Sequence, residues 1–235
     1  GKAELLAALA AAGVEAPTVD HGPVMTVAAW AEVDLEGTPV GGAALCKNLF
    51  LKDKNHRLYV VTALGDTAVD LKKLSARLGL GKKLLRMAPE ELLEETMRVP
   101  KGCVTPFALA HPSAKDVCLL LDARMQDHNA LVFHPLVNTA STAVSPAGLE
   151  AFLRACGREP AWVDLSLAPA VTKDSPPDLK ALAEAFCPSE AAKGLQADEA
   201  APAAGGGGGG KGKRKGEGKK EAAKPSGGGP AVAGE

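Results

Sequence analysis

The sequence predicts a mixed α/β domain whose largely antiparallel sheet is flanked by helices. Two observations support this fold class. Short apolar runs of strand length alternate irregularly with helical patterns, and two of these runs are separated only by a polar turn. A regular alternation of strands and helices would instead indicate a doubly wound parallel sheet. The irregular order, with its hairpin, therefore favours the mixed sheet.

Helices are predicted where apolar residues recur every three or four positions. They cover residues 2–12, 26–34, 70–78, 89–97 and 145–156. Capping residues support these limits: Thr26 and Ser145 as N-caps, Pro89 and Pro146 in first turns, and Gly13, Gly79 and Gly157 after last turns. A further short helix is expected directly after the loop 102–106.

Strands are predicted from short runs rich in apolar residues. They cover residues 46–51, 57–64, 117–121, 131–133, 139–144 and 162–165. The first two enclose the polar turn 52–56 and should therefore form a hairpin.

The folded domain is predicted to comprise residues 1–165. Residues 166–200 form a C-terminal extension with several prolines, which allows one short helix over 177–186. Residues 201–235 are rich in Gly and Lys and lack the apolar surface needed to fold, so we expect a disordered tail. The residues from Gly205 onward have a charge of +4, whereas residues 1–204 have −5. The basic tail is expected either to contact RNA or only to keep the chain soluble.

Composition excludes several classes of protein. Aromatic residues make up only 3% of the chain, which argues against a module that stacks single-stranded bases on a ring platform. The five cysteines contain no CxxC pair, so neither a zinc site nor a disulfide framework is expected. No apolar run is long enough to span a membrane, and no targeting signal is evident. We expect a cytoplasmic protein that needs no metal and no cofactor.

The first stretch that could take part in binding or catalysis is the strand around Lys47. Strand alternation places Lys47 on one face with Leu49 and Leu51, where its ammonium group would be partly desolvated. Such a cation suits a phosphate, a carboxylate or a developing oxyanion. The alternative is a lysine at a sheet edge that extends to water.

The second stretch is the loop from Gly102 to Pro106. Glycine lets the backbone approach a ligand closely, and proline fixes the shape of the loop, so free N–H groups there could hold a carbonyl oxygen. An ordinary connecting loop is the alternative. Cys46 and Cys103 are both interpreted as buried thiols, because nothing in the sequence places a base beside either.

The third stretch runs from Phe133 to Thr139 between two predicted strands. His134 could act as an acid or base, donate a hydrogen bond or line a pocket. The alternative is a histidine that caps a turn through its ring nitrogens.

Four stretches, taken in order, resemble one family: CKNLFLKDK, LGDTAVDLKKLSARLGL, GCVTPFALAH and FHPLVNTASTAVSPAGLEAFL. The family is that of the prolyl-tRNA synthetase-associated domain proteins, which includes the YbaK-type proteins and the editing insertion of bacterial prolyl-tRNA synthetase. The similarity covers roughly residues 2–165 and is strongest to the stand-alone branch that hydrolyses alanyl-tRNA(Pro), called ProXp-ala or PrdX.

The resemblance implies a fold, a reaction and a set of site residues. The fold is the YbaK-type sheet with one pocket, and the reaction is hydrolysis of the ester between alanine and the terminal adenosine of tRNA(Pro). The implied catalytic residues are Lys47, Gly102 and His134. The implied substrate-binding residues are Asn48, Cys103, Thr105, Pro106, Asn138 and Thr139. Cys46 and Cys103 replace a Thr and a Ser that are common in the family. The implied partners are mischarged tRNA(Pro) and prolyl-tRNA synthetase.

The mechanistic hypothesis has three parts. Lys47 anchors the substrate, the amides around Gly102 bind the carbonyl oxygen, and water attacks without a protein carboxylate as base. Two alternatives stay open: a deacylase for another small residue such as cysteine, and a catalytically silent tRNA-binding module that associates with a synthetase.

Overall fold

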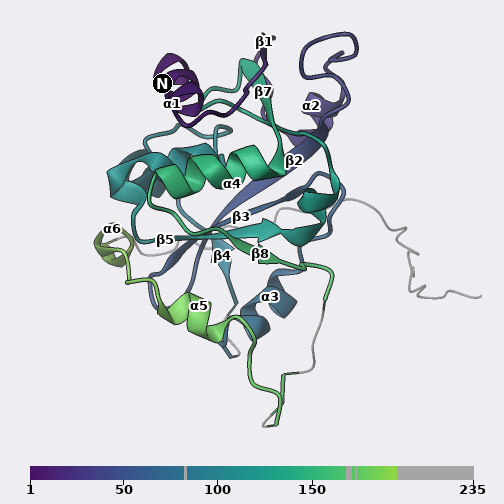
Figure 1. Ribbon diagram of the computed structural model, residues 1–235. Coiled ribbons are helices and arrows are strands. Elements are labelled where there is room, and N and C mark those ends of the chain that lie inside the picture. The colour runs from purple at the N-terminus through teal and green to yellow at the C-terminus, as the bar shows by residue number, and fades with distance from the viewer. Residues whose placement is uncertain (82–83, 168–170, 173, 195–235) are drawn as a thin grey trace, which may run out of the picture. The chain divides into compact units, whose positions relative to one another are not determined.

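In the computed structural model, the described part of the chain folds around a mixed sheet of eight strands (Figure 1). The structure describes residues 1–81, 84–167, 171–172 and 174–194, so the predicted tail 201–235 lies outside the described residues. The strands are β1 (Thr18–Asp20), β2 (Ala44–Lys52), β3 (Leu58–Leu64), β4 (Arg86–Met87), β5 (Val117–Asp122), β6 (Leu131–Phe133), β7 (Ala140–Val144) and β8 (Ala161–Val163).

The strand order is β1-β7-β6-β2-β3-β5-β8, and β4 pairs with the end of β2. Within the described residues, four strand pairs are antiparallel and three are parallel. This arrangement confirms the predicted mixed, mostly antiparallel sheet. The predicted hairpin is β2–β3, and its turn is closed by the Asp53 carboxylate. That carboxylate accepts hydrogen bonds from the amides of Asn55 and Arg57 and from the hydroxyl of the fully buried Tyr59.

Helices cover both faces of the sheet. They are α1 (Lys2–Ala11), α2 (Val27–Ala31), α3 (Leu71–Arg77), α4 (Pro146–Ala155), α5 (Lys180–Glu184) and α6 (Glu190–Gly194). The predicted N-caps are confirmed: Thr26 Oγ1 accepts from the Ala29 amide at 3.1 Å, and Ser145 Oγ accepts from the Gly148 amide at 2.9 Å. The helix α2 is shorter than predicted because its backbone tightens after Trp30, whose carbonyl accepts from the Val33 amide three residues later.

The prediction of an α-helix over residues 89–97 is wrong in its helix type. Its second part, Leu93–Met97, is a π-helix that ends at Arg98 in the left-handed region with φ 54°. The Thr96 hydroxyl donates to the Leu92 carbonyl within this stretch, and such back-bonding competes with regular helical hydrogen bonds. The following short helix is a 3-10 helix, η2 (Pro106–Ala110), as expected after the loop 102–106.

Three apolar clusters define two layers. On one face, α1 and α4 pack against the sheet through Leu9, Leu149 and Phe152, all of which are buried. On the opposite face, α3 and α5 cover one end of the sheet and α2 covers the other, in two separate clusters (Figure 1). Lys47 lies between these two clusters, because its neighbours on the same face of β2 are Leu45 in one cluster and Leu49 in the other.

Residues after the predicted domain end at 165 pack against the helices and strands. The Arg77 guanidinium donates to the Asp178 carboxylate and to the Asp164 carbonyl. Ala183 in α5 and Ala192 in α6 are fully buried. The predicted helix 177–186 is observed as the shorter α5. No helix in the described part of the chain is long and apolar enough to cross a membrane.

Candidate functional site

The sheet register places Lys47 and Asp122 in one row across three strands. Lys47 in β2 pairs with Ala63 in β3. Thr62 pairs with Leu121 in the parallel β3–β5 ladder, so the next step of this register places Asp122 beside Ala63. Since paired residues share a face, Lys47, Ala63 and Asp122 form a row across β2, β3 and β5. On the other side of β2, Leu45 pairs with Val132 in β6, and His134 follows the end of β6 with its ring stacked on Trp30.

Lys47 is a half-buried cation in the gap between the apolar clusters. Its Nζ donates to the Gly65 carbonyl at 3.0 Å, just after β3. Burial lowers the pKa of Lys47, while the nearby carboxylates of Asp66 and Asp122 favour its charged form. An ammonium group has three N–H bonds, so two stay available for a ligand. The lysine therefore has the partly desolvated position that its strand pattern predicted.

Asp122 stabilises the loop that holds Lys47. This fully buried carboxylate accepts a hydrogen bond from the Thr67 hydroxyl and another from the Arg124 amide at 3.2 Å. The Arg124 guanidinium donates to Thr67 Oγ1 at 3.1 Å. Because Thr67 is two residues from Gly65, these contacts fix the carbonyl on which the lysine ammonium rests.

His134 lies at the end of β6 with its ring largely buried. Its Nδ1 lies 3.0 Å from the Ala140 carbonyl oxygen, which can only accept, so Nδ1 must donate. Burial lowers the pKa of His134 and favours the neutral ring. In that ring Nε2 has a free lone pair and can accept a hydrogen bond. The Trp30 indole stacks on the imidazole, with ring centroids 4.2 Å apart.

A buried serine joins this histidine region to α2. Ser141 Oγ lies 2.8 Å from Trp30 Nε1 and 2.8 Å from His21 Nε2. Since an indole nitrogen can only donate, the hydroxyl accepts from Trp30 and can donate to His21. The other ring nitrogen of His21 then donates to the Gly22 carbonyl at 2.6 Å. These contacts anchor the segment 21–30 on β7.

The loop 102–106 presents backbone rather than side chains. Gly102 has φ +81°, a conformation that favours glycine. The Cys103 amide donates to the Pro100 carbonyl at 3.1 Å and is not available to a ligand. Within the described residues, the amides of Gly102 and Val104 have no hydrogen-bond partner. These two amides, rather than that of Cys103, could bind a carbonyl oxygen.

The remaining residues of this loop point into the protein. The Cys103 side chain is 1% exposed and packs in the core, where burial raises the pKa of its thiol. Pro106 is buried at the start of η2. The fully buried Thr105 hydroxyl has no hydrogen-bond partner among the described residues. Most buried hydroxyls are paired, so this group is free to bind a water molecule or a ligand.

Asn138 connects the histidine stretch to the loop. Its Nδ2 donates to Met25 Sδ at 3.0 Å, and the Met25 side chain rests on Gly102. The main-chain carbonyl of Asn138 accepts a hydrogen bond from the Val24 amide at 3.0 Å. The side chain of Thr139 is exposed, and its carbonyl accepts from the His21 amide at 2.9 Å.

One predicted site residue lies on the other face of the sheet. The side chain of Asn48 points away from Lys47 because the two are neighbours on one strand. Its Oδ1 accepts from the Thr62 hydroxyl at 2.8 Å. The structure thus does not bring Asn48 together with the lysine. Cys46 is also on that face and 1% exposed, and burial raises the pKa of its thiol, as expected of a buried cysteine.

Sequence reasoning missed five residues of this region: Met25, Trp30, Gly65, Asp122 and Ser141. Asp122 directly follows the apolar run 117–121, a pattern that could have suggested a functional carboxylate. Trp30 is one of only two tryptophans, which could have suggested an unusual environment. The other three gave no signal in the sequence.

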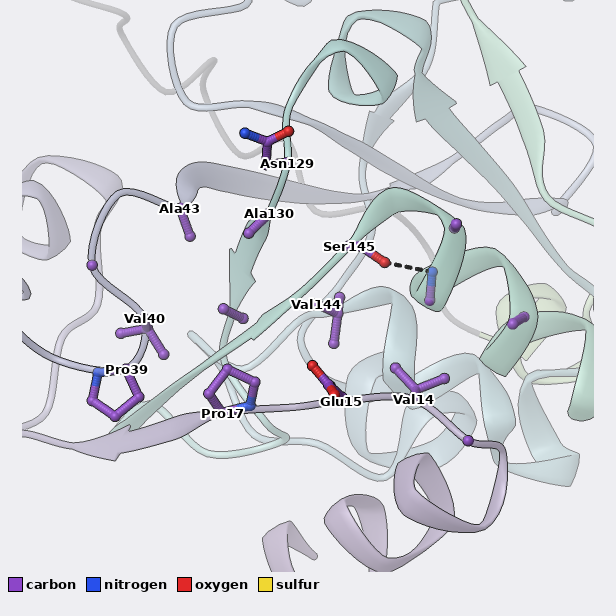
Figure 2. Close-up of a pocket in the computed structure, with 16 residues that line it drawn as sticks. Val14, Glu15, Pro17, Pro39, Val40, Ala43, Asn129, Ala130, Val144 and Ser145 are labelled. Atoms are coloured by element: carbon purple, nitrogen blue, oxygen red, sulfur yellow. Dashed lines mark hydrogen bonds between the residues drawn. The ribbon is translucent and has the colours of Figure 1, made fainter.

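A separate cavity of about 570 Å³ opens at the start of β6, beside the N-terminus of α4. Figure 2 shows Val14, Val40, Ala130 and Val144 among the small apolar residues around it. The predicted site residues do not line this cavity, and His134 follows the opposite end of β6. The cavity therefore contributes nothing to the candidate site.

Comparison with known proteins gives consistent matches. The profile of the family described as "Aminoacyl-tRNA editing domain" matches residues 21–152. The "Prolyl-tRNA synthetase associated domain-containing protein 1" of Mus musculus is 35% identical over 162 residues, which cover 68% of this chain and 93% of that protein. The "Prolyl-tRNA editing protein ProX" of Acetoanaerobium sticklandii is 31% identical over 140 residues, covering 59% and 82%. A solved structure of a proposed trans-editing enzyme for prolyl tRNA synthetase has a TM-score of 0.50 at 21% identity, covers 68% of this chain and 95% of its own, and supports the fold alone.

Proposed function

Since the chain belongs to the aminoacyl-tRNA editing domain family, we propose that it is a trans-acting deacylase that hydrolyses alanyl-tRNA(Pro). The observation that supports this most is the position of Lys47, whose half-buried ammonium donates to the Gly65 carbonyl and lies in one row with the buried Asp122. Beyond the end of β6, His134 has a neutral ring whose Nε2 can accept a hydrogen bond.

Each group has a role that its contacts allow. The lysine ammonium keeps two N–H bonds for the ester or for a nearby phosphate, beyond the one that it donates to Gly65. The free amides of Gly102 and Val104 stabilise the oxyanion that develops on the carbonyl. His134 Nε2 accepts a hydrogen bond from the ammonium group of the alanyl residue.

Water attacks the ester without a protein carboxylate as base in this scheme. Asp122 is the carboxylate in the row, but it is fully buried and engaged by Thr67 and Arg124. The ribose hydroxyl beside the ester can relay the proton: it accepts one from the attacking water while it donates its own to the ester oxygen that leaves. A substrate that lacks only this hydroxyl should therefore be hydrolysed far more slowly.

Such an activity answers a physical problem of synthetases. Alanine is smaller than proline, so a pocket that holds proline cannot exclude alanine by size, and each missing methylene is worth only about 1–3 kcal/mol. A second pocket that admits alanine and rejects proline supplies the missing discrimination. We propose mischarged tRNA(Pro) as substrate, prolyl-tRNA synthetase as its source, and the cytoplasm as the location.

The decisive experiment measures release of amino acid from alanyl-tRNA(Pro) and prolyl-tRNA(Pro) in single turnover. Lys47→Ala should lower the rate on alanyl-tRNA(Pro) by about 100-fold or more, because it removes the ammonium group that anchors the substrate, and losing one preorganised donor from an active site typically has an effect of this size. Lys115→Ala removes an exposed lysine beside the start of β5 and should leave the rate unchanged.

Equal rates for Lys47→Ala and the wild type would refute the proposed site. Release of cysteine or serine instead of alanine would keep the site and change the substrate. Tight binding of tRNA without any release would indicate a silent tRNA-binding module.

A further inference from the structure

Met25 lies directly over the glycine of the loop 102–106, although sequence patterns did not indicate it. If Gly102 had a side chain, its Cβ would lie 2.9 Å from both Cε and Sδ of Met25. Real Cβ atoms do not approach other atoms so closely, so the thioether occupies the space above the Gly102 backbone. At the same time Met25 is 54% exposed, unlike most large apolar residues of this chain.

The main chain on both sides of Met25 is fixed, whereas its side chain is not enclosed. The Val24 amide donates to the Asn138 carbonyl at 3.0 Å, and Thr26 caps α2 through its side chain. Among the described residues, the thioether has a single polar contact, the donation from Asn138 Nδ2 at 3.0 Å. The terminal atoms of Met25 can therefore move away from Gly102 without moving α2 or the loop.

From this geometry we infer that Met25 is the adjustable wall that limits the size of the aminoacyl group at Gly102. The inference rests on the proposed function, in which the free amides at Gly102 and Val104 receive the ester carbonyl. An amino acid whose carbonyl lies there must place its side chain in the space that the thioether borders.

Methionine suits this role because its side chain is unbranched and has three rotatable bonds. In this scheme a methyl group is accommodated beside the thioether in its observed position, whereas a prolyl ring displaces the thioether from Gly102 and breaks its contact with Asn138. One methylene in an apolar pocket changes selectivity by about 10- to 200-fold, so this one side chain is large enough to decide between alanine and proline.

The test compares kcat/KM for prolyl- and alanyl-tRNA(Pro) among the wild type, Met25→Ala and Met87→Ala. Met87 is the matched control because it is a methionine of similar exposure, 53%, located in β4. Met25→Ala should raise the prolyl-to-alanyl ratio by at least about tenfold, mainly through faster release of proline. Met87→Ala should leave the ratio unchanged. An unchanged ratio for Met25→Ala, or an equal loss on both substrates, would overturn the inference.

A second measurement separates this inference from the proposed function. Stable analogues in which alanine or proline is linked to adenosine by a 3′-amide can be bound but not hydrolysed. If the wild type hydrolyses neither tRNA, the proposed function fails, and calorimetry with these analogues still tests the wall. The wild type should prefer the alanyl analogue, and Met25→Ala should reduce that preference by about tenfold. Equal affinities for the two analogues, or no binding of either, would contradict a size-limiting role for Met25.

Discussion

The candidate site has two halves. The lysine half, which contains Lys47 and Asp122, is charged and built on central strands. The histidine half, which contains His134 and Trp30, is neutral and depends on a peripheral segment. Lys47 rests on a loop held by the buried Asp122 between β3 and β5. His134 is covered by Trp30 from the five-residue α2, which Ser141 ties to β7. The difference suggests a division of tasks: the rigid half supplies the charge that acts on the ester, and the other half supplies the shape that selects the substrate.

The variant Asp122→Asn tests most directly whether the lysine half depends on its buried carboxylate. Hydrogen bonds to charged groups contribute about 1.5–3 kcal/mol, so we expect kcat/KM for alanyl-tRNA(Pro) to fall about tenfold or more. The substitution also removes a charge that favours the protonated lysine, so the pKa of Lys47 should fall further. The alkaline limb of the pH profile of kcat/KM then moves to lower pH.

Asp127→Asn is the control for the Asp122 variant. The Asp127 side chain is exposed and is not among the carboxylates that act on Lys47, so the alkaline limb should not move. A folded Asp122→Asn variant with the wild-type pH profile would show that the two halves do not differ in this way.

For the histidine half we predict that pH changes the stability of the folded protein. We do not expect pH to change the charge that acts on the ester through this half. Burial holds the pKa of His134 below its ordinary value of 6.5 in the folded protein. As pH falls, the unfolded chain therefore binds this proton first. The contribution of the neutral ring to stability is complete above pH 6.5 and is lost as pH falls through the folded-state pKa.

Urea unfolding between about pH 7.5 and 5 measures this contribution. His134→Gln should lose less stability than the wild type over that interval. The exposed His128→Gln variant should behave like the wild type. If the free energy of unfolding depends on pH in the same way for the wild type and His134→Gln, then the neutral His134 does not contribute to stability as proposed.

The smallest expected effect concerns Thr105, whose hydroxyl has no partner among the described residues. Thr105→Val keeps the shape and removes a buried polar group, so it should stabilise the free protein by about 1 kcal/mol. If the hydroxyl binds the substrate, the same variant should lower kcat/KM about threefold, well below the loss of a full hydrogen bond to a charged group. Thr62→Val is the matched control because Thr62 donates to Asn48, and it should destabilise the protein. A destabilised Thr105→Val would mean that this hydroxyl is paired in the folded protein.

The parts predicted well from the sequence are those with local patterns. The hairpin β2–β3, the strands β5 to β7 and the capped helix α4 follow from apolar periodicity and capping residues, and so does the face on which Lys47 lies. The strands β1 and β4 are only three and two residues long, too short to show a period. Trp30 and His134 are 104 positions apart, so no local pattern could indicate that their rings stack. The contact between Met25 and Gly102 is equally non-local and depends on where the chain crosses itself.

The ion pair between Arg77 and Asp178 has a consequence for where this protein can be cut. The family profile ends at residue 152, yet Arg77 in α3 is 4% exposed and takes its carboxylate partner from beyond residue 165. A shortened chain that stops at 165 would leave a buried guanidinium without that partner, at a cost of about 1–3 kcal/mol. It would also uncover the apolar side of α3, where Leu74 and Leu78 are buried. The stable folded unit is therefore longer than the stretch that the family profile matches, and a shortened protein should keep the residues up to 194.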